Sequence, residues 1–295
     1  MKILIIANPI ASGGDAGKRA ERLSAILEQR GHRTELHLTR FAGDGRQRVA
    51  RTTGDVDRIV IVGGDGTFNE VLNGIPEGCS IPVAQLPTGN ANLLAHDLAL
   101  PKEPLDTANL LENGRILMAD TARMNRHKFI MIASAGFDAR VTEELKKVRT
   151  GRASNFSYIL PAFRALRNKE RTSFTAVVDD RVFVKGQWVV VCKTRSYGAI
   201  CEMAFDAGVD TGLLDIIVLP WENAGALLLY FLLAKFSRIT RLSQVSYLKG
   251  KKVAITADAP IPMEVDGDFA GRFPEVIIEI LPGCLPLMVP QHYNY

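Results

Sequence analysis

The stretch from Arg58 to Ile75, RIVIVGGDGTFNEVLNGI, decides the fold of the first part of the chain. The β-branched run Ile59–Val62 predicts a buried parallel strand. Apolar spacing over Thr67–Leu72 predicts a helix, with Thr67 as its cap and Glu70 three residues later. Between strand and helix, the glycines leave backbone N–H groups bare and able to approach an anion at the positive helix end: Gly63, Gly64 and Gly66. This arrangement predicts a phosphate-binding loop.

Asp65 has an unusual place inside this loop. A carboxylate among phosphate-binding amides is repelled by the phosphate unless a cation bridges the two, or unless the carboxylate takes a proton from a hydroxyl group. A plain strand-to-helix turn is the alternative reading. The polar side chains that accompany the glycines favour the phosphate site: Asp65, Thr67, Asn69 and Glu70.

Two further strand-to-helix junctions carry polar, glycine-bearing turns. The apolar run Lys2–Ala7 leads into Asn8-Pro9 and then into a helix that reaches Gln29. The run Ile81–Leu86 leads into Pro87-Thr88-Gly89-Asn90-Ala91-Asn92 and a helix over Leu93–Leu98. In an open parallel sheet such turns gather at the carboxyl edge, so the three line one crevice. None of them matches G-x-x-x-x-G-K-[ST] or G-x-G-x-x-G.

The chain is long enough for two cores, with 295 residues of which 47% are hydrophobic. Strands and helices alternate up to about residue 120, which predicts a doubly wound parallel α/β domain over residues 1–121, joined by the C-terminal segment 285–295. Beyond it the pattern predicts a β-sandwich over residues 122–284, with helical insertions at about 142–168 and 223–242. Its expected strands are Lys128–Ala133, Phe174–Val178, Arg181–Cys192, Leu214–Leu219, Lys252–Ala257 and Glu275–Leu281.

Cysteine usage and the apolar runs indicate a cytoplasmic protein. The four cysteines have no paired spacing, which argues against disulfides and zinc: Cys79, Cys192, Cys201 and Cys284. Lys2–Ala7 is too short for a signal peptide, and the longest apolar run, Ala224–Ala234, is shorter than the roughly 20 residues of a membrane span. The net charge of +4 is too modest to indicate nucleic acid.

Two segments combine basic residues with aromatic or aliphatic ones. The first runs from Lys146 to Arg171 and the second from Leu227 to Arg241. Such a mixture is typical of a surface that contacts an anionic membrane. Amphipathic helices packed on the sandwich, with their charges in solvent, are the alternative.

Six motifs resemble, in order and spacing, those of the diacylglycerol kinase catalytic-domain family. They are Asn8-Pro9 with Ser12-Gly13, Gly63–Thr67, Pro87–Asn92, Ala133–Ala139, Thr211–Asp215 and Val265–Asp268. The chain is most similar to the bacterial soluble lipid kinases of this family, which are relatives of sphingosine kinases and distantly of NAD kinases and phosphofructokinases. The resemblance spans nearly the whole chain and implies an NAD kinase/phosphofructokinase-like first domain.

The resemblance implies ATP and Mg²⁺ as cofactors. It places the nucleotide on Asn8, Thr39, Gly63, Gly64, Asp65, Gly66, Thr67, Asn69, Glu70, Gly89, Asn90 and Asn92. Asn90 departs from the family, which usually has threonine there. The implied catalytic base is Asp268, where the family usually has glutamate, and Asp65 is the rival base. The alternative reading of Asp266-Gly267 is a hairpin turn, which is compatible with presenting Asp268.

The resemblance also implies an accessory magnesium site, which this sequence alters. The family position of the acidic ligand is Thr211, with Gly208 and Leu213 supplying carbonyl groups. A neutral hydroxyl is a poor ligand for a hard divalent ion, so we expect this second metal to be absent.

Together these features predict an ATP-dependent lipid kinase that phosphorylates a lipid hydroxyl, with a diacylglycerol-like acceptor. A kinase of a soluble acceptor, like the NAD kinases, is one alternative, and a catalytically weakened nucleotide- or lipid-binding regulator is another. The expected partners are the lipid substrate and an anionic membrane surface, contacted transiently from the cytoplasm. A homodimer is left open.

Overall fold

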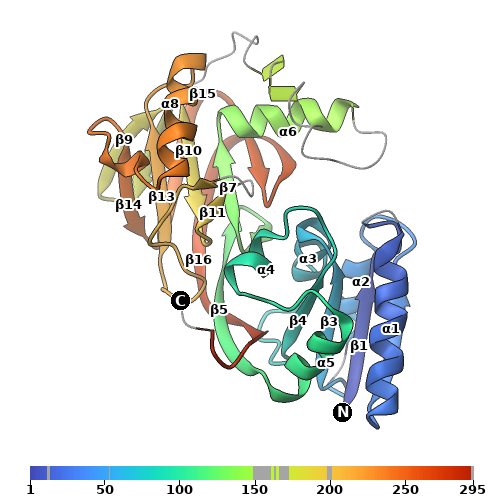
Figure 1. Cartoon of the computed structure of the whole chain (residues 1–295). Helices are drawn as coiled ribbons and strands as arrows, with labels where there is room; N and C mark the ends of the chain where they lie inside the picture. The colour runs from blue at the N-terminus through green and yellow to red at the C-terminus, as the bar shows by residue number, and fades with distance from the viewer. Residues whose placement is uncertain are drawn as a thin grey trace. The chain divides into compact units, whose positions relative to one another are not determined.

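The computed structural model describes residues 1–11, 14–52, 54–148, 161–162, 164–165, 173–197 and 201–293. These residues form two compact units. The first comprises Met1–Asp120 and resumes at Gly283, and the second is Thr121–Pro282. Two strands run through the boundaries, β5 (Arg115–Met124) and β16 (Asp268–Val289) (Figure 1).

The first unit is built on a parallel sheet. Its strands lie in the order β2-β1-β3-β4, followed by the C-terminal end of β16, where Leu287 lies opposite Val83. The strands are β1 (Lys2–Ala7), β2 (Arg33–Leu38), β3 (Arg58–Gly63) and β4 (Val83–Pro87). The central strands are apolar over almost their whole length because both of their faces are buried.

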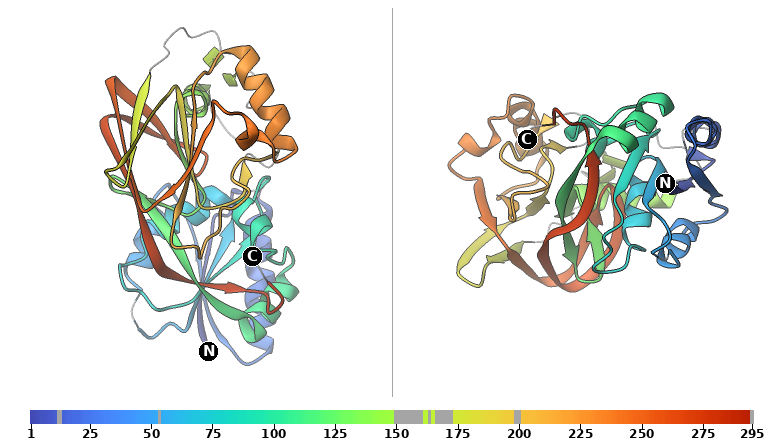
Figure 2. Two further views of the ribbon diagram at one scale, coloured as in Figure 1. Left: turned by 90° about the vertical axis from the view of Figure 1, so that its left-hand side faces the viewer. Right: turned by 90° about the horizontal axis from the view of Figure 1, so that it is seen from below.

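Helices cover both faces of this sheet, which makes the unit doubly wound, as predicted (Figures 1 and 2). The helix α1 (Asp15–Gln29) packs beside α5 (Pro104–Asn113), and α2 (Asp44–Ala50) packs beside α3 (Asp65–Leu72). A short helix, α4 (Leu93–Asp97), follows β4. Helix α1 buries residues at helical spacing, among them Ala16, Ala20, Leu23 and Leu27.

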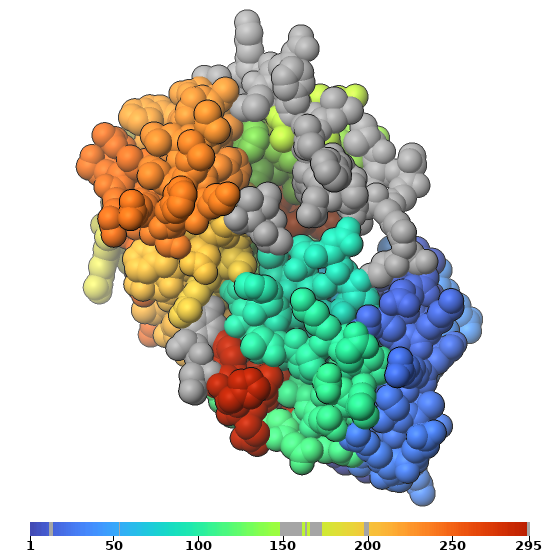
Figure 3. All heavy atoms as spheres, in the orientation of Figure 1, coloured from blue at the N-terminus to red at the C-terminus, as the bar shows by residue number. Residues whose placement is uncertain are grey.

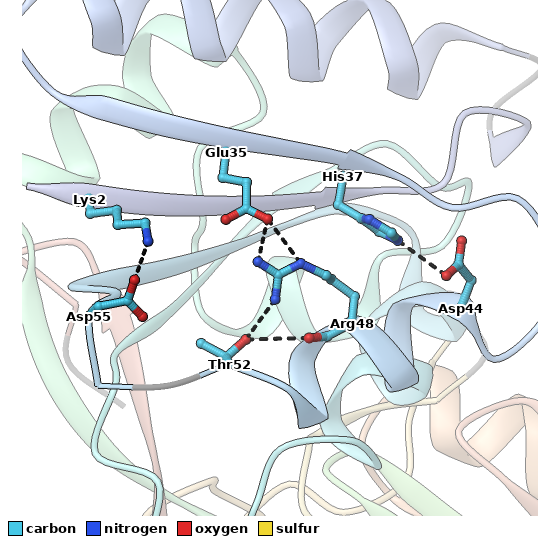
Figure 4. Close-up of polar contacts among 7 residues, drawn as sticks. All are labelled: Lys2, Glu35, His37, Asp44, Arg48, Thr52 and Asp55. Atoms are coloured by element: carbon cyan, nitrogen blue, oxygen red, sulfur yellow. Dashed lines mark hydrogen bonds and ion pairs between the residues drawn. The ribbon is translucent and has the colours of Figure 1, made fainter.

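Polar side chains on the edge strand β2 pair with side chains on α2 (Figure 4). Glu35 on β2 binds the guanidinium group of Arg48, and His37 Nε2 lies 3.3 Å from Asp44 Oδ1 at the start of α2. Lys2 pairs with Asp55 before β3. Since partly exposed ion pairs contribute only about 0–1 kcal/mol, the contacts of Arg48 and Asp44 orient α2 more than they stabilise the unit.

The second unit is an antiparallel β-sandwich whose layers share the hairpin of β15 (Lys252–Val265) and β16. The end of β15 pairs with β7, from which one layer continues through β10, β13 and β14. The start of β15 pairs with β8, which pairs with β9. The bounds are β6 (His127–Phe129), β7 (Ile132–Ala135), β8 (Phe174–Val178), β9 (Val182–Gly186), β10 (Trp188–Cys192), β13 (Leu214–Leu219) and β14 (Ser246–Gly250).

One apolar core joins the two layers of the sandwich. It includes Val191 and Ile216 from one layer and Phe174, Ile255 and Ile278 from the other, all fully buried. A small separate ribbon consists of β11 (Ser196–Tyr197) and β12 (Cys201–Glu202). Two helices accompany the sandwich, α6 (Phe137–Val148) and α8 (Ala224–Lys235), and a 3₁₀ turn follows at Ile239–Arg241.

The prediction of Thr67 as a helix cap is wrong. Helix α3 begins at Asp65 after the extended Gly64, with φ −85° and ψ −172°, and no side chain caps it. A carboxylate in the first helical turn is favoured by the helix dipole, so the helix begins at Asp65, ahead of Thr67.

Two predicted strands are each divided in two. The segment Lys128–Ala133 bends after β6, and Arg181–Cys192 is interrupted at Gln187, whose N–H donates to Leu219 O at 2.9 Å. Neither break changes the apolar pattern, so the sequence did not reveal it. Helix α6 begins before residue 142, and α8 ends before 242.

None of the helices in the described residues is long and apolar enough to cross a membrane. All four cysteines are described and none forms a disulfide.

Candidate functional site

The polar turns of the first unit meet at the carboxyl edge of its sheet. Ala7 lies in register with Leu38 and with Val62, and Gly63 lies in register with Pro87, so the residues that follow these strands share one edge. The strand order reverses between β1 and β3, and ligands of open α/β sheets bind at such a switch point.

The glycine turns after β3 and β4 touch backbone to backbone. A Cβ atom on Gly64 would lie 3.1 Å from Gly89 Cα, and one on Gly89 would lie 2.8 Å from Gly64 Cα. Asn92, in the left-handed region at φ 47°, holds the second turn: its Oδ1 accepts from Gly89 N–H at 2.9 Å and its Nδ2 donates to Gly89 O at 2.6 Å. Thr88 N–H donates to Gly63 O at 3.2 Å. The contact therefore requires glycine at both positions.

Asp65 connects these turns to the start of α4. Its Oδ2 accepts a hydrogen bond from Leu93 N–H at 3.0 Å, whereas its Oδ1 is buried and has no hydrogen-bond partner in the described part of the chain. Burial raises the pKa of this carboxyl, although the backbone amides of Leu93, Leu94 and Asn92 act in the opposite direction. A buried, unsatisfied carboxylate oxygen is costly, and such groups concentrate at functional sites. The Asp65 carboxylate can coordinate a divalent cation or accept a proton from a hydroxyl group. The residues present therefore fit a Mg²⁺–nucleotide complex.

Two residues that were predicted to bind the nucleotide, Thr67 and Glu70, make contacts within the protein. A Cβ on Gly63 would lie 2.5 Å from Thr67 Cβ, so Thr67 covers Gly63. Glu70 Oε1 accepts from Gly45 N–H at 2.9 Å in the first turn of α2. Glu70 thus satisfies a helix terminus.

Of the remaining predicted nucleotide residues, Asn8, Thr39 and Asn90 follow strands of the sheet, and Gly66 and Asn69 belong to α3. Asn8 Oδ1 accepts from Ile10 N–H at 3.3 Å, and Thr39 N–H donates to Ala7 O at 2.8 Å. Asn69 Oδ1 accepts from Asn73 Nδ2 at 3.1 Å. Gly66 and Asn90 are exposed.

Thr88 was missed by the sequence reasoning. It follows β4 directly, is buried, and its Oγ1 has no hydrogen-bond partner among the described residues. Its place next to Gly89, after a buried strand, was the available signal.

The second unit presents Asp268 on a tight turn. Asp266 and Gly267 have φ 48° and 88°, the left-handed pair that a type I′ hairpin requires, and Val265 lies opposite Asp268. Asp268 is exposed and lines a pocket of about 220 Å³ with neighbours from α6 and β16: Thr142, Leu145, Lys146, Gly267 and Phe269. The hairpin reading and the presentation of Asp268 thus hold together.

Two buried carboxylates anchor this turn. Asp266 Oδ1 accepts from the N–H groups of Met131 and Ile132 at 3.0 and 2.9 Å. Glu264 Oε2 accepts from Gly267 N–H at 2.8 Å, and Ser134 Oγ donates to Glu264 Oε1 at 3.2 Å. Sequence reasoning missed Glu264, because nothing local marks its role.

Glu264 belongs to a buried acidic cluster with Asp138. Burial, and then the charge of Asp138, raise the pKa of Glu264 well above its usual range. Asp138 accepts from Trp188 Nε1 at 2.9 Å and from Tyr197 Oη at 2.7 Å, and burial raises its pKa too. Ionisation of Glu264 is therefore disfavoured both by its burial and by the charge of Asp138.

The three residues of the implied accessory metal site lie together. Thr211 Oγ1 lies 3.2 Å from Gly208 O and 3.2 Å from Leu213 O. Lys193 Nζ donates to the same Thr211 Oγ1 at 3.2 Å and to Leu213 O at 2.8 Å. An ammonium group on these oxygens does not fit a magnesium ion.

Comparison with known proteins gives matches to both units. Residues 2–124 match the diacylglycerol kinase catalytic domain, and residues 131–289 match the YegS C-terminal NAD kinase beta sandwich-like domain. The first unit belongs to the diacylglycerol kinase catalytic-domain family and the second to the YegS C-terminal domain family. The resemblance inferred from the six motifs is thereby confirmed, and membership supports lipid kinase activity.

Relatives of this family match along nearly their whole length. A diacylglycerol kinase of Staphylococcus saprophyticus is 28% identical over 92% of this chain and 90% of its own, and one from Staphylococcus aureus is 28% identical over 92% and 87%. A crystal structure of a diacylglycerol kinase from Bacillus anthracis has a TM-score of 0.76 at 22% identity, covering 98% of this chain and 97% of its own. A second structure from that organism reaches 0.81 at 21% identity, covering 99% and 96%. These structures support the two-domain fold.

The glycine contact yields a first prediction. Gly64→Val keeps an allowed backbone conformation but inserts a branched side chain against Gly89, and such overpacking costs about 1–3 kcal/mol. We expect affinity for adenine nucleotides to fall about tenfold or more, as measured by isothermal titration calorimetry. Gly54→Ala, where a Cβ meets nothing within 4 Å, is the control. Unchanged nucleotide affinity in Gly64→Val would contradict the phosphate-loop assignment.

A second prediction separates stability from activity at Asp65. Because burial raises the folded-state pKa above the usual 3.8, the folded state holds the proton more tightly, and the free energy of unfolding falls as pH rises from about 3.8 through the folded pKa. Asp65→Asn removes this loss. The variant should therefore be at least as stable as wild type at pH 7 in urea denaturation, yet lack phosphoryl transfer.

Asp106→Asn is the matched control, since Asp106 is an exposed carboxylate in the first turn of α5. It should keep its activity. Activity of Asp65→Asn within a few-fold of wild type would remove Asp65 from the chemistry.

Proposed function

We propose that this protein is an ATP-dependent kinase that transfers the γ-phosphoryl group to a lipid hydroxyl, with a diacylglycerol-like acceptor. The observation that carries the proposal is the unpartnered, buried Asp65 Oδ1 beside the Gly64–Gly89 contact. It occurs in a member of a family whose matched relatives bear the name diacylglycerol kinase.

The first unit supplies the nucleotide site in this proposal. The backbone N–H groups of Gly64–Gly66, at the N-terminus of α3, would hold phosphate oxygens, and Asp65 would meet the Mg²⁺ ion that accompanies ATP. When bound, this complex provides the phosphoryl group and neutralises its charge, and positioning supplies most of the catalysis.

Asp268 is the proposed general base. Its turn is fixed from behind by Glu264 and Asp266, so its carboxylate is presented from a rigid position. A base so held can take the proton of the acceptor hydroxyl as the phosphoryl group transfers. Asp65 is the alternative base, because its raised pKa and unpartnered oxygen suit a proton acceptor.

The membrane contact is proposed for α8, which lies at the surface in orange in Figure 3. Four apolar side chains on and beside this helix are 45–66% exposed: Leu228, Leu229, Leu232 and Phe236. Exposed basic residues follow at Lys235, Arg238 and Arg241. Exposed leucines beside basic groups suit the boundary of an anionic bilayer.

The first predicted membrane segment is described only in part. Lys146, Lys147 and Arg164 are described, and all three are exposed. The other residues on which the prediction rested lie outside the described residues: Arg149, Arg152, Phe156, Tyr158, Ile159, Leu160, Phe163, Leu166, Arg167, Lys169 and Arg171.

A labelled-ATP assay tests the function. Diacylglycerol, phosphatidylglycerol and a sphingoid base are presented in mixed micelles, with NAD as a soluble acceptor. We expect label in a lipid and the highest turnover with diacylglycerol. Label in NAD alone, or in no acceptor, would overturn the proposal.

The third prediction concerns Asp268. If it is the base, Asp268→Asn should lower kcat on the order of 10²–10⁴-fold while KM for ATP is unchanged. Asp268→Glu should retain most of the activity, because it keeps the carboxylate. Asp258→Asn, an exposed carboxylate on β15, is the control. Near wild-type turnover in Asp268→Asn would shift the role of base to Asp65.

The fourth prediction concerns α8. Replacing Leu228 and Leu232 by serine should weaken binding to anionic phospholipid vesicles by roughly 10- to 100-fold. Fully burying one leucine contributes about 1.5–3 kcal/mol, and these two are 64% and 51% exposed in the protein, so each can gain about half of that. Phe183→Ser removes an exposed aromatic side chain from β9 and should leave vesicle binding unchanged. Equal binding by the leucine variant and wild type, in vesicle co-sedimentation, would show that α8 is not the membrane contact.

A further inference from the structure

The loop from Gly208 to Leu213 folds around a single hydroxyl oxygen. Thr211 Oγ1 lies within 3.2 Å of the carbonyl oxygens of Gly208 and Leu213, and Leu213 N–H points at it from 3.4 Å. Two carbonyls and a side-chain oxygen thus converge where the family resemblance implies magnesium ligands. A hydroxyl carries no charge, so this set lacks the carboxylate that a hard cation prefers.

Lys193 supplies a cation to this loop from within the chain. It follows β10, its side chain is 0% exposed, and its own N–H donates to Met131 O at 2.8 Å, which fixes its backbone. Its Nζ donates to Leu213 O at 2.8 Å and to Thr211 Oγ1 at 3.2 Å. Two of the three ammonium hydrogens are therefore directed at the oxygens of the implied metal site.

Burial of an ammonium group is tolerated only when acceptors and negative charge surround it. Leu213 O and Thr211 Oγ1 are two of its acceptors, and the buried Asp215 lies within electrostatic reach of Lys193. A magnesium ion on the same oxygens would lie next to this buried ammonium group, and the two like charges would repel each other. The two cations exclude each other.

We propose that the Lys193 ammonium group replaces the accessory magnesium ion and clamps the Gly208–Leu213 loop as an internal cation. This loop leads directly into β13, a central strand of the sandwich. The second unit therefore folds and keeps this loop closed without a bound metal. The proposal is independent of the proposed function, because it concerns neither nucleotide nor lipid.

The first test uses the wild-type protein without nucleotide or lipid. After gel filtration in magnesium-free buffer, atomic emission should find no stoichiometric magnesium, and Tm should be the same in EDTA and in MgCl₂. A Tm that rises saturably with MgCl₂ in wild type and also in Asp65→Asn would overturn the proposal, since the second protein lacks the carboxylate of the phosphate loop.

The second test removes the positive charge of Lys193. Lys193→Met removes the buried cation that binds Leu213 O and Thr211 Oγ1, so Tm should fall by about 5 °C or more and MgCl₂ should not restore it. Lys185→Met, an exposed lysine on β9, is the control and should melt as wild type. An unchanged Tm in Lys193→Met would show that the clamp is not needed.

The third test rebuilds the metal site. In Lys193→Ala with Thr211→Asp, the ammonium is gone and a carboxylate faces the two carbonyls, so MgCl₂ should raise Tm saturably. Thr211→Asp alone keeps Lys193 and should show no magnesium response. A magnesium response in that single variant, equal to that of the double variant, would show that lysine and metal do not compete.

Discussion

The contact between the backbones of Gly64 and Gly89 is the constraint on which the first unit's site depends. Parallel strands bring the two turns to one edge, but only the absence of both Cβ atoms lets them touch. Asn92 then locks the second turn through two hydrogen bonds to Gly89, from a left-handed backbone that few residues other than glycine and asparagine adopt readily. With these turns in contact, Leu93 N–H reaches Asp65, and the carboxylate is fixed at the edge of the sheet.

The second unit fixes its exposed carboxylate by another route. A type I′ turn needs two residues at positive φ, and Asp266-Gly267 meets that need locally. Local preference alone would leave the turn free to tilt. The buried side chain of Asp266 accepts hydrogen bonds from the backbone of Met131 and Ile132, and that of Glu264 accepts one from Gly267 within the turn. These bonds hold the turn, and Asp268 with it, against the sandwich.

Local pattern was sufficient for the fold class and for the positions of the strand-to-helix turns in the first unit. Strands β1 and β3 are continuous apolar runs bounded by glycine or Asn-Pro, and such signals act over a few residues. The roles of individual side chains were less accessible, because they depend on partners far along the chain. Glu70 reads as part of the phosphate loop but binds Gly45, and Thr67 reads as a cap but packs over Gly63. Lys193 carries no local sign that it will meet Thr211.

Asp65 and Lys193 both place an ionisable group away from solvent, but they differ in whether its polar atoms have partners. Asp65 keeps one carboxylate oxygen buried without a partner, so the folded state bears a cost that a bound cation or a hydroxyl proton would remove. Lys193 is buried more completely, yet its ammonium group has acceptors in place and a buried carboxylate nearby. These two environments are the basis of the two proposals: an external cation at the glycine edge of the first unit, and the Lys193 ammonium group in place of a metal in the Gly208–Leu213 loop.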